Sequence, residues 1–145
     1  MSDSSASTVQ IDAPLADVAA KLYAIDAYPT WLSSIKKVEV VESDDQGRAL
    51  KANVSIDAGV MKDRATLIYD WSSAPSEVTF SLDEADMLTE MSGGYELKDN
   101  ADDTVTVTYE LHVELSMPVP DMMRTKAERE TIDKALNELK SKLEA

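Results

Sequence analysis

Residues 119–143 read VPDMMRTKAERETIDKALNELKSKL, and this stretch predicts one long amphipathic helix. Pro118 and Pro120 mark its start, because proline is tolerated in a first helical turn but disrupts a helix interior. Asp121 at the beginning and Lys140 near the end place charges that complement the helix dipole. The rest of the chain predicts a sheet that holds this helix.

The helix carries an uneven stripe of apolar and small residues at every fourth position: Met123, Ala127, Thr131, Ala135, Leu139 and Leu143. Ile132 and Leu136 widen the stripe in its second half. The small residues in the middle either let the helix lie close to a sheet or leave a space beneath it. We expect residues 132–143 to anchor the helix and residues 122–131 to form a movable lid over an aromatic cluster.

The strand before the helix has the most regular pattern in the chain. Apolar residues occupy every second position, at Val105, Val107, Tyr109, Leu111, Val113, Leu115 and Met117, and the residues between them are polar. This alternation predicts one apolar face and one solvated face, with His112 on the solvated face. The strand spans about 43 Å and the helix about 35 Å, so the two are expected to pack along one another.

The upstream chain adds one strand, two short helices and a series of strands joined by turns. A first strand is expected at residues 5–12, helices at 14–25 and 26–35, and period-two strands near 36–41, 50–56, 61–71, 78–82 and 87–97. Turns are expected at residues 44–47, 58–59, 72–76 and 83–86. Gly93-Gly94 indicates a bulge or a sharp bend inside its strand. Short connections predict an antiparallel sheet of about seven strands, and hence an α+β fold.

Composition limits the possible classes of function. The 145 residues fit a single domain, with residues 1–4 expected to be a flexible N-terminus. The chain has no cysteine and no signal-like or membrane-spanning stretch, which favours a cytoplasmic protein without stable membrane insertion. Its net charge of −14 disfavours nucleic acid as a partner, and the sequence identifies no protein partner.

The order of elements, with a set of local motifs, resembles the START-like (SRPBCC) superfamily and its bacterial polyketide cyclase/dehydrase-like branch. The residues that carry the resemblance are Ala13-Pro14, Asp26, Tyr28-Pro29, Trp31, the run from Ile35 to Val41, Tyr69-Asp70-Trp71 and Met117-Pro118-Val119-Pro120. The resemblance covers nearly the whole chain. It implies the helix-grip fold, a curved antiparallel sheet around a long C-terminal helix with an apolar cavity between them. Members of this superfamily commonly bind lipids, sterols, polyketides or other hydrophobic molecules there.

The candidate site residues are mainly aromatic, sulfur-containing and small side chains expected to face the interior. The predicted ligand-binding set is Tyr28, Trp31, Tyr69, Trp71, Phe80, Met91, Tyr95, Tyr109, Met123, Ala127 and Thr131. Asp63 is the one candidate catalytic residue, because strand alternation places it on the inner face near a strand end. His112, the only histidine, is expected at the surface, so neither a catalytic triad nor a metal site nor a bound cofactor is predicted.

Three hypotheses of function follow from this pattern. The first is a protein that binds a hydrophobic small molecule (a lipid, sterol or polyketide-like compound) between the sheet and the C-terminal helix. The second is a cyclase or dehydratase acting on a polyketide, with Asp63 or a tyrosine as acid or base. The third is a protein-interaction module whose interior is filled by its own side chains. The volume of the cavity distinguishes the third hypothesis from the first two.

Overall fold

The computed structural model describes residues 5–58, 61–74, 76–116 and 119–144. The predicted turn residue Gly59 and the predicted Met117-Pro118 segment lie outside these residues. In chain order the elements are β1 (Ser5–Ile11), α1 (Leu15–Tyr23), the 3-10 helix η1 (Ile25–Thr30), β2 (Ile35–Ser43), β3 (Ala49–Ala58), β4 (Met61–Asp70), β5 (Glu77–Ala85), β6 (Leu88–Asp99), β7 (Val105–Leu115) and α2 (Asp121–Leu143).

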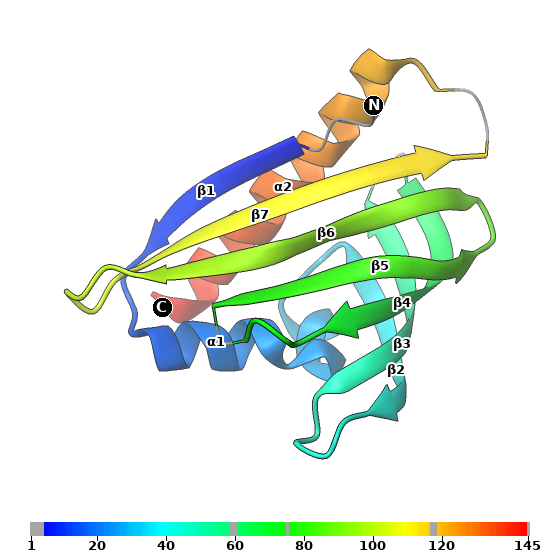
Figure 1. The fold of residues 1–145 in the computed structure, drawn as a ribbon. Coiled ribbons are helices and arrows are strands. Elements are labelled where there is room, and N and C mark those ends of the chain that lie inside the picture. Colours follow the sequence, from blue (N-terminus) through cyan, green and yellow to red (C-terminus); the bar gives the residue numbers. More distant parts are fainter. Residues whose placement is uncertain (1–4, 59–60, 75, 117–118, 145) are drawn as a thin grey trace.

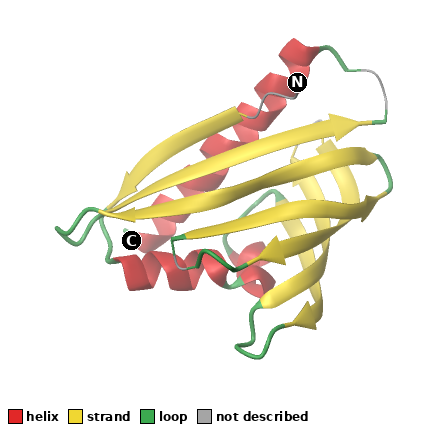
Figure 2. Ribbon diagram, viewed as in Figure 1, coloured by secondary structure: helices red, strands yellow, loops and turns green. Residues whose placement is uncertain are grey.

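The strands form one antiparallel seven-stranded sheet in the order β1-β7-β6-β5-β4-β3-β2. Strands β2 to β7 pair with their chain neighbours, as short turns require, and β1 closes against β7 at the far edge. The sheet curves, α2 lies behind β1 and β7, and α1 and η1 lie beneath its concave side (Figure 1 and Figure 2). The predicted curved antiparallel sheet around a long C-terminal helix is confirmed.

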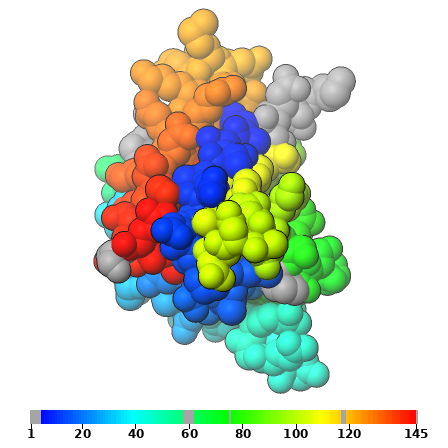
Figure 3. All heavy atoms as spheres, turned by 90° about the vertical axis from the view of Figure 1, so that its left-hand side faces the viewer, coloured from blue at the N-terminus to red at the C-terminus, as the bar shows by residue number. Residues whose placement is uncertain are grey.

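The long helix is anchored by the apolar part of its stripe. Ile132, Leu136 and Leu139 are buried, and α2 packs against β1 and β7. Met123 was expected to face the interior, and this prediction is wrong: Met123 is 55% exposed, and Met122 beside it is 84% exposed. The start of α2 (orange) extends past the end of β1 (dark blue) at one end of the molecule (Figure 3), and the side chains of Met122 and Met123 face solvent there.

Strand β7 shows the predicted alternation on its inner face, where Val105, Val107 and Leu111 are fully buried. His112 departs from the prediction, because it points to the outer face and yet only 3% of it is exposed. Its imidazole lies 3.4 Å from Nη1 of Arg124 and 3.7 Å from Oε2 of Glu128, both on α2. The helix therefore reaches around the sheet edge and covers a residue that strand alternation alone assigns to solvent.

Strand β6 differs from prediction at its glycine pair and at Met87. The glycine pair forms no bulge, since β6 pairs in unbroken register with both neighbours at Gly93 and Gly94. The glycines instead permit a close approach: a Cβ at Gly93 would lie 2.1 Å from the carbonyl oxygen of Glu110. The irregularity falls between Leu88 and Glu90, where it turns Leu88 inward and leaves Met87, expected on the inner face, 39% exposed.

Several element ends differ from prediction by a few residues. Helix α1 ends at Tyr23, where residue 25 was expected, and its N-cap is Pro14, which makes no side-chain cap hydrogen bond. Strand β5 runs to Ala85 through the predicted turn at residues 83–86. Within the described ranges, no helix is long and apolar enough to cross a membrane.

Candidate functional site

An enclosed cavity lies inside the curve of the sheet, between its concave face, η1 and the middle of α2. Its volume is about 50 Å³. Its walls combine strand residues from β3 to β7 with Thr131 and Ala135 of α2. The small side chains in the middle of the helix stripe therefore border a space, which is one of the two outcomes that the sequence left open.

Cross-strand pairs build the aromatic walls of the cavity. Tyr95 of β6 is the register partner of Tyr109 of β7, and their rings stack with centroids 4.2 Å apart and planes inclined by 22°. Tyr69 of β4 is likewise paired with Phe80 of β5, with ring centroids 6.2 Å apart. Directly opposed residues on antiparallel strands bring their side chains together on one face, so strand register fixes both pairs.

The fourth tyrosine of the cavity comes from the 3-10 helix. The hydroxyl of Tyr28 donates a hydrogen bond of 2.6 Å to the carbonyl oxygen of Leu22 at the end of α1. Its ring also meets Trp31 edge to face, with centroids 5.5 Å apart. These contacts tie Tyr28 of η1 to the end of α1 and to Trp31. The lining also includes Ser34, which the sequence pattern did not indicate.

Burial keeps the cavity phenols neutral. It raises the pKa of Tyr28, Tyr69, Tyr95 and Tyr109 well above the usual phenol value near 10. The hydrogen bond between Tyr95 and Tyr109 raises the pKa of Tyr95 further and partly offsets the rise for Tyr109. At neutral pH these groups offer O–H donors and hydroxyl acceptors, and they hold no negative charge.

The rest of the cavity lining also carries no charged side chain. Among the described residues that line it, there is no Asp, Glu, Lys, Arg or His. A proton transfer in this space would have to use a phenol, because no carboxylate or imidazole borders it. The site is thus suited to hold an apolar molecule and to donate hydrogen bonds to a polar group on it.

The structure brings together most of the predicted site residues and separates the others. Those that line the cavity are Tyr28, Tyr69, Phe80, Met91, Tyr95, Tyr109 and Thr131. Trp31, Trp71, Met123 and Ala127 do not. Trp71 is buried at the end of β4, where its indole N–H donates a 2.6 Å hydrogen bond to the carbonyl of Ala49 and Arg48 lies over its ring. Trp31 packs behind Tyr28, so both tryptophans contact lining tyrosines and neither reaches the cavity.

Asp63, the candidate catalytic residue, has a structural role and lies apart from the cavity lining. Its carboxylate accepts hydrogen bonds from the backbone N–H groups of Met87 at 2.9 Å and Leu88 at 2.7 Å. A third comes from the N–H of Arg64 at 2.8 Å. Asp63 thereby ties the β5–β6 turn to β4, and it is absent from the lining of the cavity.

The cavity volume bears on all three hypotheses of function. About 50 Å³ holds on the order of a few water molecules, whereas pockets for drug-sized ligands measure roughly 300–1,000 Å³. Stacked Tyr95 and Tyr109, with Phe80 and Met91, occupy the remaining interior. The interior is therefore nearly filled in this conformation, and a larger ligand would have to displace side chains.

Comparisons with known proteins place this architecture. The family model described as polyketide cyclase/dehydrase and lipid transport matches residues 3–144. A START superfamily protein from Mycobacterium smegmatis superposes with a TM-score of 0.90 at 20% identity, covering 97% of each chain. The Zhui aromatase/cyclase from Streptomyces sp. R1128 gives a TM-score of 0.84 at 16% identity, covering 99% of this chain and 94% of that one.

A plant protein shares the same architecture. Major latex-like protein 151 from Panax ginseng superposes with a TM-score of 0.72 at 12% identity, covering 98% of this chain and 97% of that one. A search of curated proteins gave no match. At these identities the superpositions show a common fold.

Proposed function

The chain belongs to the polyketide cyclase/dehydrase and lipid transport family, and from that premise we propose that it binds a small hydrophobic molecule bearing a carbonyl or hydroxyl group. The ligand lies between the sheet and the middle of α2. The observation that carries the proposal is the enclosed cavity lined by apolar side chains and four neutral tyrosines. No membrane-spanning or charged group is needed for this role.

Burial of the ligand supplies most of the binding free energy. At about 25 cal/mol per Å², 200 Å² of apolar ligand surface contributes roughly 5 kcal/mol before the entropy cost of association. The phenols then orient the ligand, since a neutral O–H donor pairs with a carbonyl oxygen in an otherwise dry site. Tyr95 and Tyr109 are the best placed, because their hydroxyls bond to each other and have no backbone partner among the described contacts.

Ligand entry enlarges the cavity. The stacked pair Tyr95–Tyr109 and the flexible side chain of Met91 are the groups whose rotation opens space toward Thr131 and Ala135. A protein of this kind is closed without ligand, and the ligand selects or induces the open arrangement. The apparent affinity is then lowered by the free energy needed to open the cavity.

The test combines extraction with titration. Native mass spectrometry of the purified chain, followed by organic extraction, looks for a retained molecule. A panel of fatty acids, sterols and flat aromatic polyketides is then titrated against tryptophan fluorescence, to which both tryptophans report through their contacts with Tyr28 and Tyr69. Ala135→Phe fills the cavity and should abolish the response, while Lys134→Phe on the exposed side of the same helix should preserve it.

A second candidate function is a cyclase or dehydratase. It is favoured by the fold shared with the Zhui aromatase/cyclase and by phenols that can donate a proton to a developing enolate. The lack of a carboxylate or imidazole in the described lining weighs against it. If Tyr28→Phe, Tyr69→Phe, Tyr95→Phe and Tyr109→Phe variants all cyclise a poly-β-keto probe as fast as the parent chain, catalysis by a cavity phenol is rejected.

The third candidate is an interaction module with a filled core, and the small cavity volume favours it. Absence of any extracted molecule and of any fluorescence response across the panel, with Ala135→Phe less stable than the parent chain, would support this function over ligand binding. Overpacking a well-filled core normally lowers the free energy of unfolding by about 1–3 kcal/mol.

A further inference from the structure

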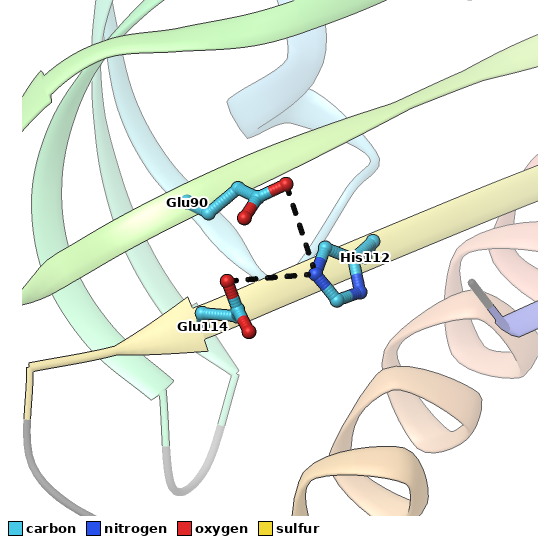
Figure 4. A group of neighbouring side chains, drawn as sticks. All are labelled: Glu90, His112 and Glu114. Carbon is cyan, nitrogen blue, oxygen red and sulfur yellow. Dashed lines mark ion pairs between the residues drawn. The ribbon is translucent and has the colours of Figure 1, made fainter. Parts of the chain in front are cut away.

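A cluster of potential metal ligands lies on the outer face of the sheet, outside the cavity. Glu90 of β6 and His112 and Glu114 of β7 point toward one another (Figure 4). Nε2 of His112 is 3.8 Å from Oε1 of Glu90 and 3.9 Å from Oε2 of Glu114. One ligand atom from each residue lies within 4.8 Å of the other two.

The two carboxylates are held together by strand register. Glu90 and Glu114 are directly opposed on β6 and β7. Like charges in this position destabilise a sheet unless a cation lies between them. The arrangement concentrates negative charge where the imidazole presents Nε2.

The histidine is oriented from behind by the helix. Nδ1 of His112 lies 3.7 Å from Oε2 of Glu128, a carboxylate with no exposed surface. Glu128 is itself fixed by Ser5 Oγ at 2.7 Å, by the N–H of Val113 at 2.8 Å and by Arg124 Nη1 at 3.0 Å. A carboxylate lies behind Nδ1 and Nε2 faces further oxygen atoms, as around histidine ligands in metal sites, although the Nδ1–Oε2 distance exceeds a hydrogen bond and Arg124 Nη1 lies nearer to Nδ1, at 3.4 Å.

From this geometry we infer that Glu90, His112 and Glu114 bind a divalent first-row transition metal of the Zn²⁺ class. One imidazole nitrogen and two carboxylate oxygens suit Zn²⁺ better than Mg²⁺ or Ca²⁺, which take oxygen ligands alone. Nε2 coordinates the ion, and solvent completes the coordination. The imidazole proton then resides on Nδ1, so Arg124 Nη1, itself a donor and 3.4 Å from Nδ1, must shift before Glu128 Oε2, 3.7 Å away, can accept a hydrogen bond from Nδ1.

The distances require only a small contraction. Zn–N and Zn–O bonds of about 2.0–2.2 Å in a tetrahedron place ligand atoms about 3.4 Å apart. The present separations of 3.8 and 3.9 Å exceed that by about half an ångström. The side chains of Glu90 and Glu114 are 47% and 49% exposed, so they can make this movement and admit an ion from solvent.

The experiment uses the full chain and Zn²⁺ itself. Titration calorimetry should give one site. Glu90→Gln and Glu114→Gln, which preserve side-chain shape at half-exposed positions, should each weaken zinc affinity at least about tenfold. Glu110→Gln is the matched control, because Glu110 is exposed on the same face of β7, and it should leave the affinity unchanged. Excess Mg²⁺ should not displace the zinc.

The single histidine gives a second readout that a merely structural cluster would not move. On zinc addition, the ¹⁵N signals of the His112 ring should shift to those of an imidazole metallated at Nε2 and protonated at Nδ1. Three results would overturn the inference: no binding up to millimolar zinc, binding without change in the His112 signals, or equal weakening by Glu110→Gln. The first would assign the cluster to a plain charge network.

Discussion

Strands β6 and β7 carry two regions of opposite character on their two faces. On the inner face, Tyr95 and Tyr109 are stacked, buried and neutral in the cavity. On the outer face, Glu90, His112 and Glu114 gather charge beside the helix. The comparison shows that strand alternation does more than separate apolar from solvated residues, since the same strand pair lines an apolar cavity on one face and gathers ionisable side chains on the other.

Helix α2 contacts both regions through different turns. Thr131 and Ala135 border the cavity, whereas Glu128 and Arg124, one and two turns before Thr131, contact His112 from behind. The expected lid at residues 122–131 is corrected accordingly. Of residues 122–131, Thr131 borders the cavity, whereas Met122 and Met123 are exposed and buried Glu128 is hydrogen-bonded to β1 and β7.

The largest expected effect is a loss of stability at alkaline pH, caused by the four buried phenols of the inner face. Burial raises the pKa of the four cavity phenols above the value near 10 of the unfolded chain. Below pH 10 both states keep these protons, so stability is fully present there. Above pH 10 the unfolded chain loses them first, and the free energy of unfolding falls by about 1.4 kcal/mol per pH unit for each phenol. Urea unfolding between pH 8 and 11 measures this slope.

Phenylalanine variants sharpen the same measurement. Tyr95→Phe removes one buried phenol. Above pH 10 the free energy of unfolding should therefore fall less steeply with pH, by about 1.4 kcal/mol per pH unit. Tyr23→Phe is the comparison outside the cavity: partial burial raises the pKa of Tyr23 to about 12, so its share of the slope is present between pH 10 and 11 and levels off near pH 12, earlier than that of the cavity phenols. An unchanged slope in Tyr95→Phe would show that the cavity phenols do not control alkaline stability.

The next largest effect is on the outer face, at Glu128. Glu128→Ala leaves Arg124, Ser5 Oγ and the N–H of Val113 without their buried acceptor, and should lower the free energy of unfolding by about 3–5 kcal/mol. Glu130→Ala, on the exposed side of the same helix, should change it by less than about 0.5 kcal/mol. Urea denaturation at pH 7 distinguishes them, and a loss below 1 kcal/mol at Glu128 would contradict the anchoring of α2 by this contact.

A smaller effect is expected from breaking the phenol pair at neutral pH. Tyr109→Phe loses the hydrogen bond to Tyr95 with little change in volume, so the free energy of unfolding should fall by about 1 kcal/mol. Affinity for a ligand identified by extraction should fall by a comparable amount, about fivefold to tenfold, measured by fluorescence titration. Tighter binding in Tyr109→Phe would mean that the cavity prefers ligands without a polar group.

The smallest effect is expected in the exposed first turn of α2, outside both the cavity and the outer cluster. Met122→Ser, at a side chain 84% exposed, should leave the free energy of unfolding within about 0.5 kcal/mol of the parent chain and leave ligand affinity unchanged. Equilibrium unfolding and the same fluorescence titration provide the check. A clear loss of ligand affinity would restore the idea that the first turns of α2 close over the cavity.

The inner face was predictable because strand alternation is a local property. The period of two placed Tyr69, Phe80, Tyr95 and Tyr109 inward, and the structure assembles all of them in one cavity. The tryptophans were misplaced because alternation gives the face and not the position along the sheet. Trp71 directly follows β4, where its indole N–H donates a hydrogen bond to the carbonyl of Ala49 and the guanidinium of Arg48 lies over its ring.

The outer cluster was only partly visible in the sequence. Glu114 and His112 are two residues apart in a strand and so share a face, but nothing local pairs them with Glu90 of another strand. The irregularity between Leu88 and Glu90 sets that register, and it also explains the exposure of Met87. Asp63 was misjudged for a similar reason, since its partners are backbone N–H groups at positions 87 and 88, brought near by the β4–β5 pairing.

The sequence by itself determined the order of elements, the antiparallel sheet, the extent of α2 and the identity of the inward aromatic residues, because periodicity, prolines and turns act over a few neighbours. Tertiary structure decided the volume left inside the sheet and the burial of His112 and Glu128. Both depend on the crossing of α2 over the β1–β7 edge and on strand register. Those are set by the packing of segments more than a hundred residues apart, as in the bond between Ser5 and Glu128.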